Sequence, residues 1–133
     1  MNIEIIIQDN SELFLQELEN KMPEILNACG NELYKSIYTF MTEDKIVDTG
    51  RLRGSISYST PYENYKNPMM FNNGEDFIEN VKERNSVVYG SNVEYASNVE
   101  LGTSRQRARN YIKTGTFRAV PQLKGAVENI LRE

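Results

Sequence analysis

A long series of apolar residues at helical spacing fills the first third of the chain. Apolar positions recur every three or four residues after Ser11, which is suited to cap a helix: Phe14, Leu18, Met22, Ile25, Cys29, Leu33, Ile37 and Phe40 or Met41. This pattern predicts one long amphipathic helix, or two collinear ones. Because Pro23 costs about 3 kcal/mol inside a helix, we expect a break or kink near Lys21–Met22, with Pro23 in the first turn of the second piece.

Two segments predict single strands. Residues 2–8 are rich in isoleucine and precede two turn-forming residues. A second turn is expected at Asp48 and Gly50, where the aspartate bonds to nearby amides and the glycine accepts a positive φ. Apolar and polar residues alternate directly after this turn. The alternation predicts a strand that carries Arg51 and Arg53 on its polar face.

The middle of the chain combines a long loop with a hairpin. Between residues 60 and 76, prolines, asparagines and aromatic residues occur without a period, which predicts a loop. This loop either forms an arm that orders against a neighbouring subunit or folds over its own core. Residues 77–82 and 87–90 flank a polar turn and predict a hairpin.

Two further helices are predicted near the C-terminus. Asn92 is suited to cap a short helix that runs through Leu101, and Gly102 supplies its left-handed stop. Pro121 is placed to open a last helix. The sequence therefore predicts an α+β fold, with an antiparallel three- to four-stranded sheet packed against a long N-terminal helix, a short helix and a C-terminal helix. At 133 residues we expect a single domain over 1–133.

The formal charge of the chain is divided unevenly. The segment 101–124 contains six basic residues and no acidic one, a charge of +6, which with a total of −4 leaves −10 on the remaining residues. An acidic body with one basic segment favours self-association through opposite charges, or a local phosphate contact, over general nucleic-acid binding.

The residue types argue against most enzyme designs. The chain has no histidine, the residue that most readily moves protons near neutral pH. Cys29 is alone, so no intrachain disulfide is possible, and its apolar neighbours predict a buried thiol. The acidic pairs at 43–44 and 75–76 are expected to be solvated, which leaves a nuclease site made only of carboxylates as the enzymatic alternative. We therefore expect no enzymatic activity, no cofactor and no metal.

The chain also lacks the signals of membrane proteins. Its longest aliphatic run, Ile5–Ile7, is far shorter than the ~20 apolar residues that a membrane helix needs. The acidic N-terminal residues lack the basic region of a signal peptide. We expect neither membrane insertion nor export by that route, and synthesis in the cytoplasm.

Two segments carry a specific pattern. Residues 47–56 read VDTGRLRGSI, and residues 87–103 read VVYGSNVEYASNVELGT. Together they resemble the tail-completion, or head–tail joining (neck), family of tailed bacteriophages, the lambdoid-phage gene-product-ten-like minor structural proteins. Residues 117–123 look like the proline-opened final helix of that family. The resemblance spans roughly 32–131, and the sequence departs from the family pattern in its long 61–74 insertion and its N-terminal strand.

The resemblance implies a structural role in a phage or phage-tail-like particle. The family forms rings at the tail end or neck, six-fold where they match a tail tube, which complete the tail or join it to the head. The implied partners are further copies of the chain, the adjacent tail-tube, terminator or connector proteins, and transiently the packaged DNA. The implied location is the virion or tail particle, after synthesis in the bacterial host cytoplasm. A small DNA-binding module that uses the 101–124 segment is the alternative function.

Several residues are candidates for contacts outside the subunit. Arg51 and Arg53 are either a solvated face or partners of acidic groups on the next subunit. Glu100 is expected to face away from the core and is an interface candidate.

The basic segment supplies the other candidates, Arg105, Arg107, Arg109 and Lys113. The three arginines face DNA, dock on an acidic partner ring, or lie in a solvated loop. Tyr95, Val99 and Leu101 have the spacing of core residues.

Overall fold

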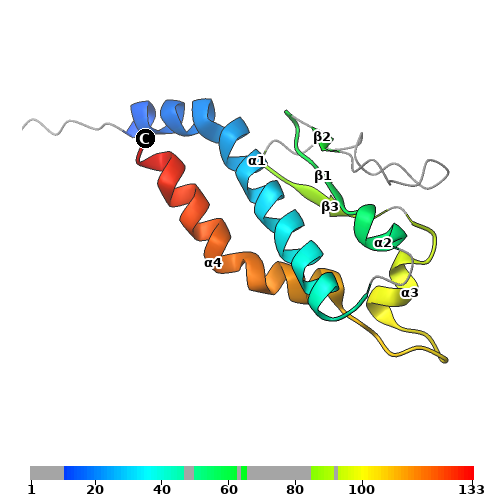
Figure 1. Ribbon diagram of the computed structural model, residues 1–133. Coiled ribbons are helices and arrows are strands. Elements are labelled where there is room, and N and C mark those ends of the chain that lie inside the picture. The colour runs from blue at the N-terminus through cyan, green and yellow to red at the C-terminus, as the bar shows by residue number, and fades with distance from the viewer. Residues whose placement is uncertain (1–10, 47–49, 63, 66–84, 92) are drawn as a thin grey trace, which may run out of the picture.

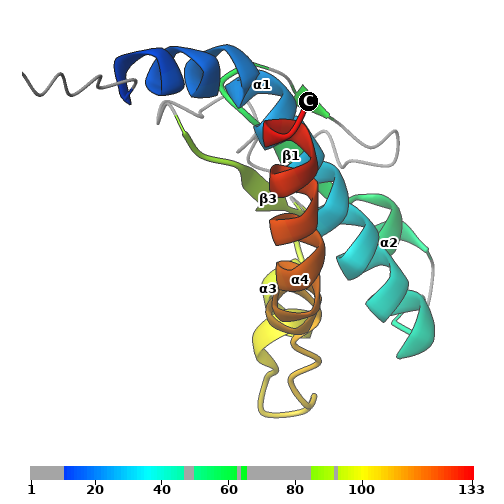
Figure 2. The same ribbon diagram turned by 90° about the vertical axis from the view of Figure 1, so that its left-hand side faces the viewer.

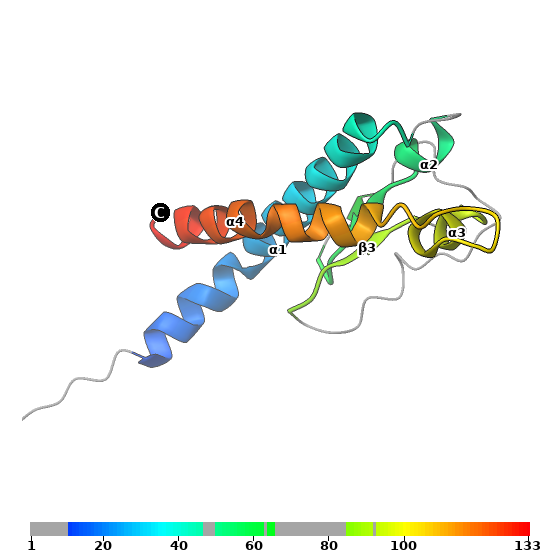
Figure 3. The ribbon, with the colours of Figure 1, turned by 90° about the horizontal axis from the view of Figure 1, so that it is seen from below.

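A long helix lies between a second long helix and a small sheet (Figure 1). The structure, a computed structural model, describes residues 11–46, 50–62, 64–65, 85–91 and 93–133. The long helices are α1 (Ser11–Glu43) and α4 (Tyr111–Leu131), which cross one another as Figure 3 shows. The architecture is α+β, with the long N-terminal helix that the sequence predicts.

The sheet is small and antiparallel. Strand β1 (Ser57–Ser59) pairs with β3 (Val88–Gly90), and the two-residue β2 (Asn64–Tyr65) pairs with the other edge of β1. In this register Tyr58 of β1 lies opposite both Tyr65 and Tyr89. Apart from β2, the described residues therefore form one antiparallel pair, where the sequence predicts three to four strands.

Helix α1 contacts the sheet through one face and α4 through another. A Cβ atom on Gly30 would lie 2.5 Å from Tyr58 Cε2 and would clash with the ring, so glycine is required for β1 to approach this closely. The Tyr58 hydroxyl donates to Asn27 Oδ1 at 2.8 Å. Further along α1, the Ser36 hydroxyl donates to the carbonyl oxygen of Gly115 in α4 at 2.6 Å.

The core lies where the C-terminal half of α1 meets the short elements. The helices α2 (Arg51–Gly54) and α3 (Ala96–Leu101) close it at the end of the molecule far from the C-terminus (Figure 1). Its buried members are Ile37, Met41, Ile46, Leu52, Ile56, Val93, Ala96 and Tyr111. The predicted apolar stripe of α1 is buried or half-buried from Ile25 onward, whereas Phe14 near its start is exposed.

Pro23 bends α1 without breaking it. The helix is continuous from Ser11 to Glu43, so the predicted single long helix is confirmed and the alternative of two pieces with Pro23 in a first turn is wrong. Its axis changes direction within the N-terminal half, as Figures 1 and 2 show. Proline has no amide hydrogen to donate inside a helix, and its ring crowds the preceding turn. Pro23 is exposed, and the helix continues through it.

Pro121 likewise lies inside a helix and not at its start. Helix α4 begins at Tyr111, ten residues earlier than the sequence pattern predicts. The carbonyl that Pro121 deprives of a partner belongs to Phe117, which is 80% exposed. Residues 111–117 include β-branched residues and a glycine, which are poor helix formers. Packing against α1 therefore decides the conformation of this segment.

The strand predicted directly after Gly50 begins later than expected. Arg51–Gly54 form a helical turn, and β1 starts only at Ser57. Gly50 has φ 72°, and its carbonyl accepts a hydrogen bond from the Gly54 amide at 2.8 Å. Leu52 is inserted in the core, which holds the turn in place. Arg51 and Arg53 thus lie on a helical turn, and the prediction of a polar strand face is wrong.

Other predictions fall partly or wholly outside the described residues. These are the strand over 2–8, most of the 60–76 loop, the first strand of the 77–90 hairpin, and the residues Asp48 and Asn92. The short helix ends at Leu101, as predicted, but begins at Ala96. Neither long helix contains a stretch in the described range that is apolar enough to cross a bilayer.

Candidate functional site

The two motif segments meet at an ion pair. The Arg51 guanidinium donates two hydrogen bonds to the Glu94 carboxylate, of 3.0 and 2.9 Å, and lies 5.7 Å from the centre of the Tyr95 ring. The pKa of the Glu94 carboxyl lies below its ordinary value, because the carboxylate accepts a hydrogen bond from its own backbone amide and because Arg51 is adjacent. This pair joins α2 to the segment before α3, which are separated by forty residues of chain. Bidentate geometry makes it more specific than a single-point surface contact.

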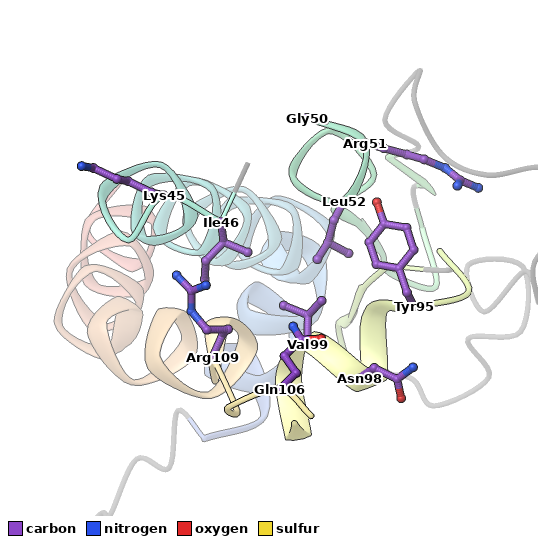
Figure 4. A pocket seen from close by; sticks show the side chains of 10 residues that line it. All are labelled: Lys45, Ile46, Gly50, Arg51, Leu52, Tyr95, Asn98, Val99, Gln106 and Arg109. Carbon is purple, nitrogen blue, oxygen red and sulfur yellow. The ribbon is translucent and has the colours of Figure 1, made fainter. Parts of the chain in front are cut away.

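A cavity of about 780 Å³ lies beside this pair (Figure 4). Both motif segments line it, together with the end of α1 and the basic segment. Ile46, Leu52, Val99 and Arg109 point into the space between the elements, whereas Lys45 and Arg51 extend away from it on opposite sides. The remaining lining residues are Gly50, Tyr95, Asn98 and Gln106. The lining contains cationic and neutral groups and, within the described chain, no carboxylate.

Glu100 binds the start of α4. Its carboxylate accepts hydrogen bonds from the backbone amides of Ile112 at 2.7 Å and Lys113 at 3.1 Å. The residue that caps α4, Asn110, provides no side-chain hydrogen bond, so Glu100 satisfies two of the free amides of the first turn. Its negative charge also favours the positive end of the helix dipole. The sequence does not reveal this role, because acceptor and amides are brought together by the 102–110 loop.

Tyr111 is buried beside this contact. Its hydroxyl donates to the Ala96 carbonyl at 3.2 Å, and its ring is 1% exposed. Burial raises the pKa of Tyr111 well above its ordinary value, and the charges of Glu100 and the neighbouring Tyr95 add to the effect. Tyr111 therefore ties α4 to α3 as a neutral donor.

Arg109 holds the basic segment against the end of α1. Its guanidinium donates to the Asp44 carbonyl oxygen at 2.6 Å and to the Asp44 carboxylate at 3.1 Å. Its backbone amide donates to the Val99 carbonyl at 2.9 Å. The Arg109 side chain is 27% exposed, so most of it is withdrawn from solvent. Within the subunit this residue has a structural partner.

Arg53 and Arg118 stack on aromatic rings of α1. The Arg53 guanidinium lies 4.7 Å from the centre of the Tyr38 ring and donates to the Thr42 hydroxyl at 3.0 Å. Arg118 lies 4.9 Å from the Phe40 ring and pairs with Glu43 at 3.1 Å. Arg53 of α2 and Arg118 of α4 therefore both pack on the surface of α1. Arg118 is not among the candidates that the sequence predicts.

Arg105, Arg107 and Lys113 remain available for external contacts. All three are exposed, and their charged groups have no ion-pair partner in the portion of the chain that the structure describes. Arg105 and Arg107 lie on the 102–110 loop, and Lys113 lies in the first turn of α4. In the basic segment, Arg109 and Arg118 are thus paired within the subunit. The charged groups of Arg105, Arg107 and Lys113 are exposed to solvent.

Two predicted turn glycines have positive φ angles; Gly50 is in the left-handed conformation and Gly102, with ψ 171°, is not. Gly50 has φ 72° and Gly102 has φ 78°. A Cβ on Gly102 would lie 2.6 Å from the backbone nitrogen of Ala108, so this position requires glycine for a second reason. Gly102 ends α3 and lets the following loop fold back on it.

The predictions for apolar residues near the site are partly confirmed. Tyr95 and Val99 pack against the core. Leu101 is 74% exposed, so its assignment to the core is wrong. Cys29 is half-buried and not fully buried; this burial, and then the nearby Glu32, raise the pKa of its thiol.

The groups of the site can make ionic and hydrogen-bonding contacts with a partner. Over the described ranges, no cluster of three acidic, histidine or cysteine side chains could hold a metal ion. The site combines a bidentate ion pair, a cation-lined cavity and exposed arginines on a folded loop. No protein-family model, curated protein or solved structure matches this chain.

Proposed function

We propose that this chain is a structural subunit of a tailed bacteriophage or phage-tail-like particle. It forms a ring at the tail end or neck and completes the tail or joins it to the head. Its role is that of an assembly adaptor and not of an enzyme. The observation that carries the proposal is the junction of the two motif segments, 47–56 and 87–103, through Arg51 and Glu94. The residues that resemble the tail-completion family thus belong to one site.

The distribution of charge supports assembly through unlike surfaces. Arg105 and Arg107 are exposed cations, whereas the N-terminal half of α1 is acidic. A contact between different surfaces of neighbouring copies is heterologous and closes into a ring when the rotation between copies allows it. Following the family, we infer six copies on a tail tube and tail-tube, terminator or connector proteins as neighbours. From the strand patterns of the sequence we infer a sheet of three to four strands.

Deletion of the gene in the strain that produces the particle tests this function. The expected result is separate heads and tails, or tails of irregular end structure, in electron micrographs, with recovery when the wild-type chain is supplied. The chain should also be present in purified wild-type particles by mass spectrometry. Complete, joined particles without the protein would contradict the proposal.

A DNA-binding module is the second candidate. Exposed Arg105 and Arg107 favour it, because each cation that neutralises a phosphate releases counterions and strengthens binding. The test is a gel-shift titration of the wild type, the double variant Arg105→Ala/Arg107→Ala and the control Lys35→Ala, an exposed lysine of α1. Arg109 is left intact because its removal would release Asp44. Micromolar or tighter binding at physiological salt, lost only in the double variant, would favour this candidate over the adaptor.

A further inference from the structure

The apolar stripe of α1 continues beyond the end of α4. The Lys21 ammonium donates to the carbonyl oxygens of Ile130 at 3.0 Å and Glu133 at 2.9 Å, which marks where α4 ends beside α1. Residues 12–20, here named the α1 overhang, extend past this point (Figure 2). Phe14 and Leu15 in the overhang are each 56% exposed. They continue the stripe that is buried further along the helix.

Helix α4 has an apolar stripe on its outer side. Phe117 is 80% and Val120 is 55% exposed. At 100° per residue these two share one face with three further exposed residues. The whole set, here named the α4 outer stripe, is Lys113, Phe117, Val120, Lys124 and Leu131. Gly115 and Ala119, on the opposite face of α4, are buried.

The two surfaces carry opposite charges. The α1 overhang contains three glutamates and no basic residue. Glu12 and Glu17 among them are exposed and form no ion pair with the described part of the chain. Lys113 and Lys124 flank Phe117 and Val120 on the α4 outer stripe and are likewise exposed. The α1 overhang thus carries only acidic charges. The α4 outer stripe carries two lysines, and Glu128 at its edge pairs with Arg132 at 4.0 Å.

The fold keeps these surfaces apart within one molecule. Helix α1 contacts α4 through the face that contains Gly115, where the Ser36 hydroxyl binds the Gly115 carbonyl. The overhang is a direct continuation of α1, so it cannot also cover the opposite face of the same α4 helix. Among the described residues, the overhang therefore leaves the stripe of its own molecule uncovered, and the overhang of another copy can reach it.

We propose that the α1 overhang of one copy docks on the α4 outer stripe of the next copy. Phe14 and Leu15 pack against Phe117 and Val120, and the glutamates of the overhang face the flanking lysines. The contact joins two different surfaces, so it propagates from copy to copy in one direction and suits a ring. The inference deepens the assembly function proposed above and rests on it.

Paired cysteine variants of the full chain test this contact. In a Cys29→Ala background, Phe14→Cys and Val120→Cys are purified separately, mixed and oxidised. The expected product is a dimer linked between positions 14 and 120, in clear excess over either variant alone. Gln122→Cys is the matched control, because Gln122 is exposed on α4 but lies off the outer stripe.

Charge reversal tests the electrostatic part of the same contact. Lys113→Glu/Lys124→Glu in the Val120→Cys chain should lower the yield about tenfold, which corresponds to ~1.4 kcal/mol. Glu12→Lys/Glu17→Lys in the Phe14→Cys chain should restore it. Circular dichroism checks that each variant is folded.

Three results would overturn the proposal. The first is a 14–120 yield no greater than that of the Gln122→Cys control, as expected if residues 1–10 or a different protein cover the overhang. The second is a product linked between positions 14 and 14 in place of the 14–120 product. The third is a 14–120 yield that does not change on charge reversal. Particle experiments remain independent of these results. If the chain is found at the tail end but the 14–120 product does not form, the assembly function is supported and this contact is contradicted. If the 14–120 product forms but the chain is absent from the particle, the contact is supported and the assembly function is contradicted.

Discussion

Substitution of Gly115 by alanine tests the packing that orients α4. Gly115 is buried where α4 crosses α1. An added Cβ would lie 2.8 Å from Ile37 Cα and 2.5 Å from Ile37 Cγ1. A side-chain atom can rotate away, but the Ile37 backbone cannot move without shifting α1. The substitution therefore forces the two helices apart.

The expected magnitude is the balance of two terms. Overpacking of a close contact costs about 1–3 kcal/mol, and alanine gains about 1 kcal/mol over glycine inside a helix. Gly115→Ala should thus lower the free energy of unfolding by up to about 2 kcal/mol. Gly125→Ala is the matched control, because no atom lies within 4 Å of a Cβ at Gly125 in the same helix. It should raise the free energy of unfolding by about 1 kcal/mol.

Urea denaturation followed by far-ultraviolet circular dichroism measures both variants. The account expects them to differ by about 1–3 kcal/mol, with Gly125→Ala the more stable. Equal stabilities would refute the reasoning, because they would show that α1 and α4 are not in close contact at Ile37. Gly115→Ala should also lower the 14–120 cross-linking yield, since it shifts the α4 outer stripe relative to the α1 overhang.

Three further predictions concern the site. Glu100→Gln should lower the free energy of unfolding by about 0.3–1 kcal/mol, because a charge is lost at the α4 N-terminus, and thermal melts against the wild type check it. A double-mutant cycle on Arg51 and Glu94 should give a favourable coupling free energy that becomes smaller as the salt concentration rises. The pKa of Glu94 is lowered in the folded state, so the coupling should be fully present at pH values above the ordinary pKa of a glutamate. It should disappear as the pH falls through the lower pKa that Glu94 has in the folded state. Tyr111→Phe should destabilise the chain by about 0.5–1.5 kcal/mol at neutral pH, because the hydrogen bond from the Tyr111 hydroxyl to the Ala96 carbonyl is lost. Because the folded Tyr111 pKa is raised, this difference in unfolding free energy should narrow when denaturation is repeated above pH ~10, where the unfolded wild type ionises.

The helices illustrate how far the sequence predicts this fold. The spacing of apolar residues predicts α1 correctly, because a period of three and four residues places them along one face of a helix. The helix starts predicted near Pro23 and Pro121 are wrong. They are predicted because proline fits the first turn of a helix, where its missing amide hydrogen costs no hydrogen bond. Pro23 and Pro121 instead lie inside continuous helices, and both are exposed.

The site shows the complementary limit. The positive φ angles of Gly50 and Gly102 are predictable, because they depend only on the residues that form each turn. The partners of Arg51, Glu100 and Arg109 are not, because each contact joins residues that only the tertiary fold brings together. Alternation after Gly50 predicts a strand, whereas insertion of Leu52 in the core fixes a helical turn.

Cryo-electron microscopy of the intact particle tests the central claim most directly. The account predicts a closed ring of copies of this chain at the tail end or neck, with the α1 overhang of each copy against the α4 outer stripe of the next. A reconstruction in which the tail end and neck are fully accounted for by other proteins would contradict it.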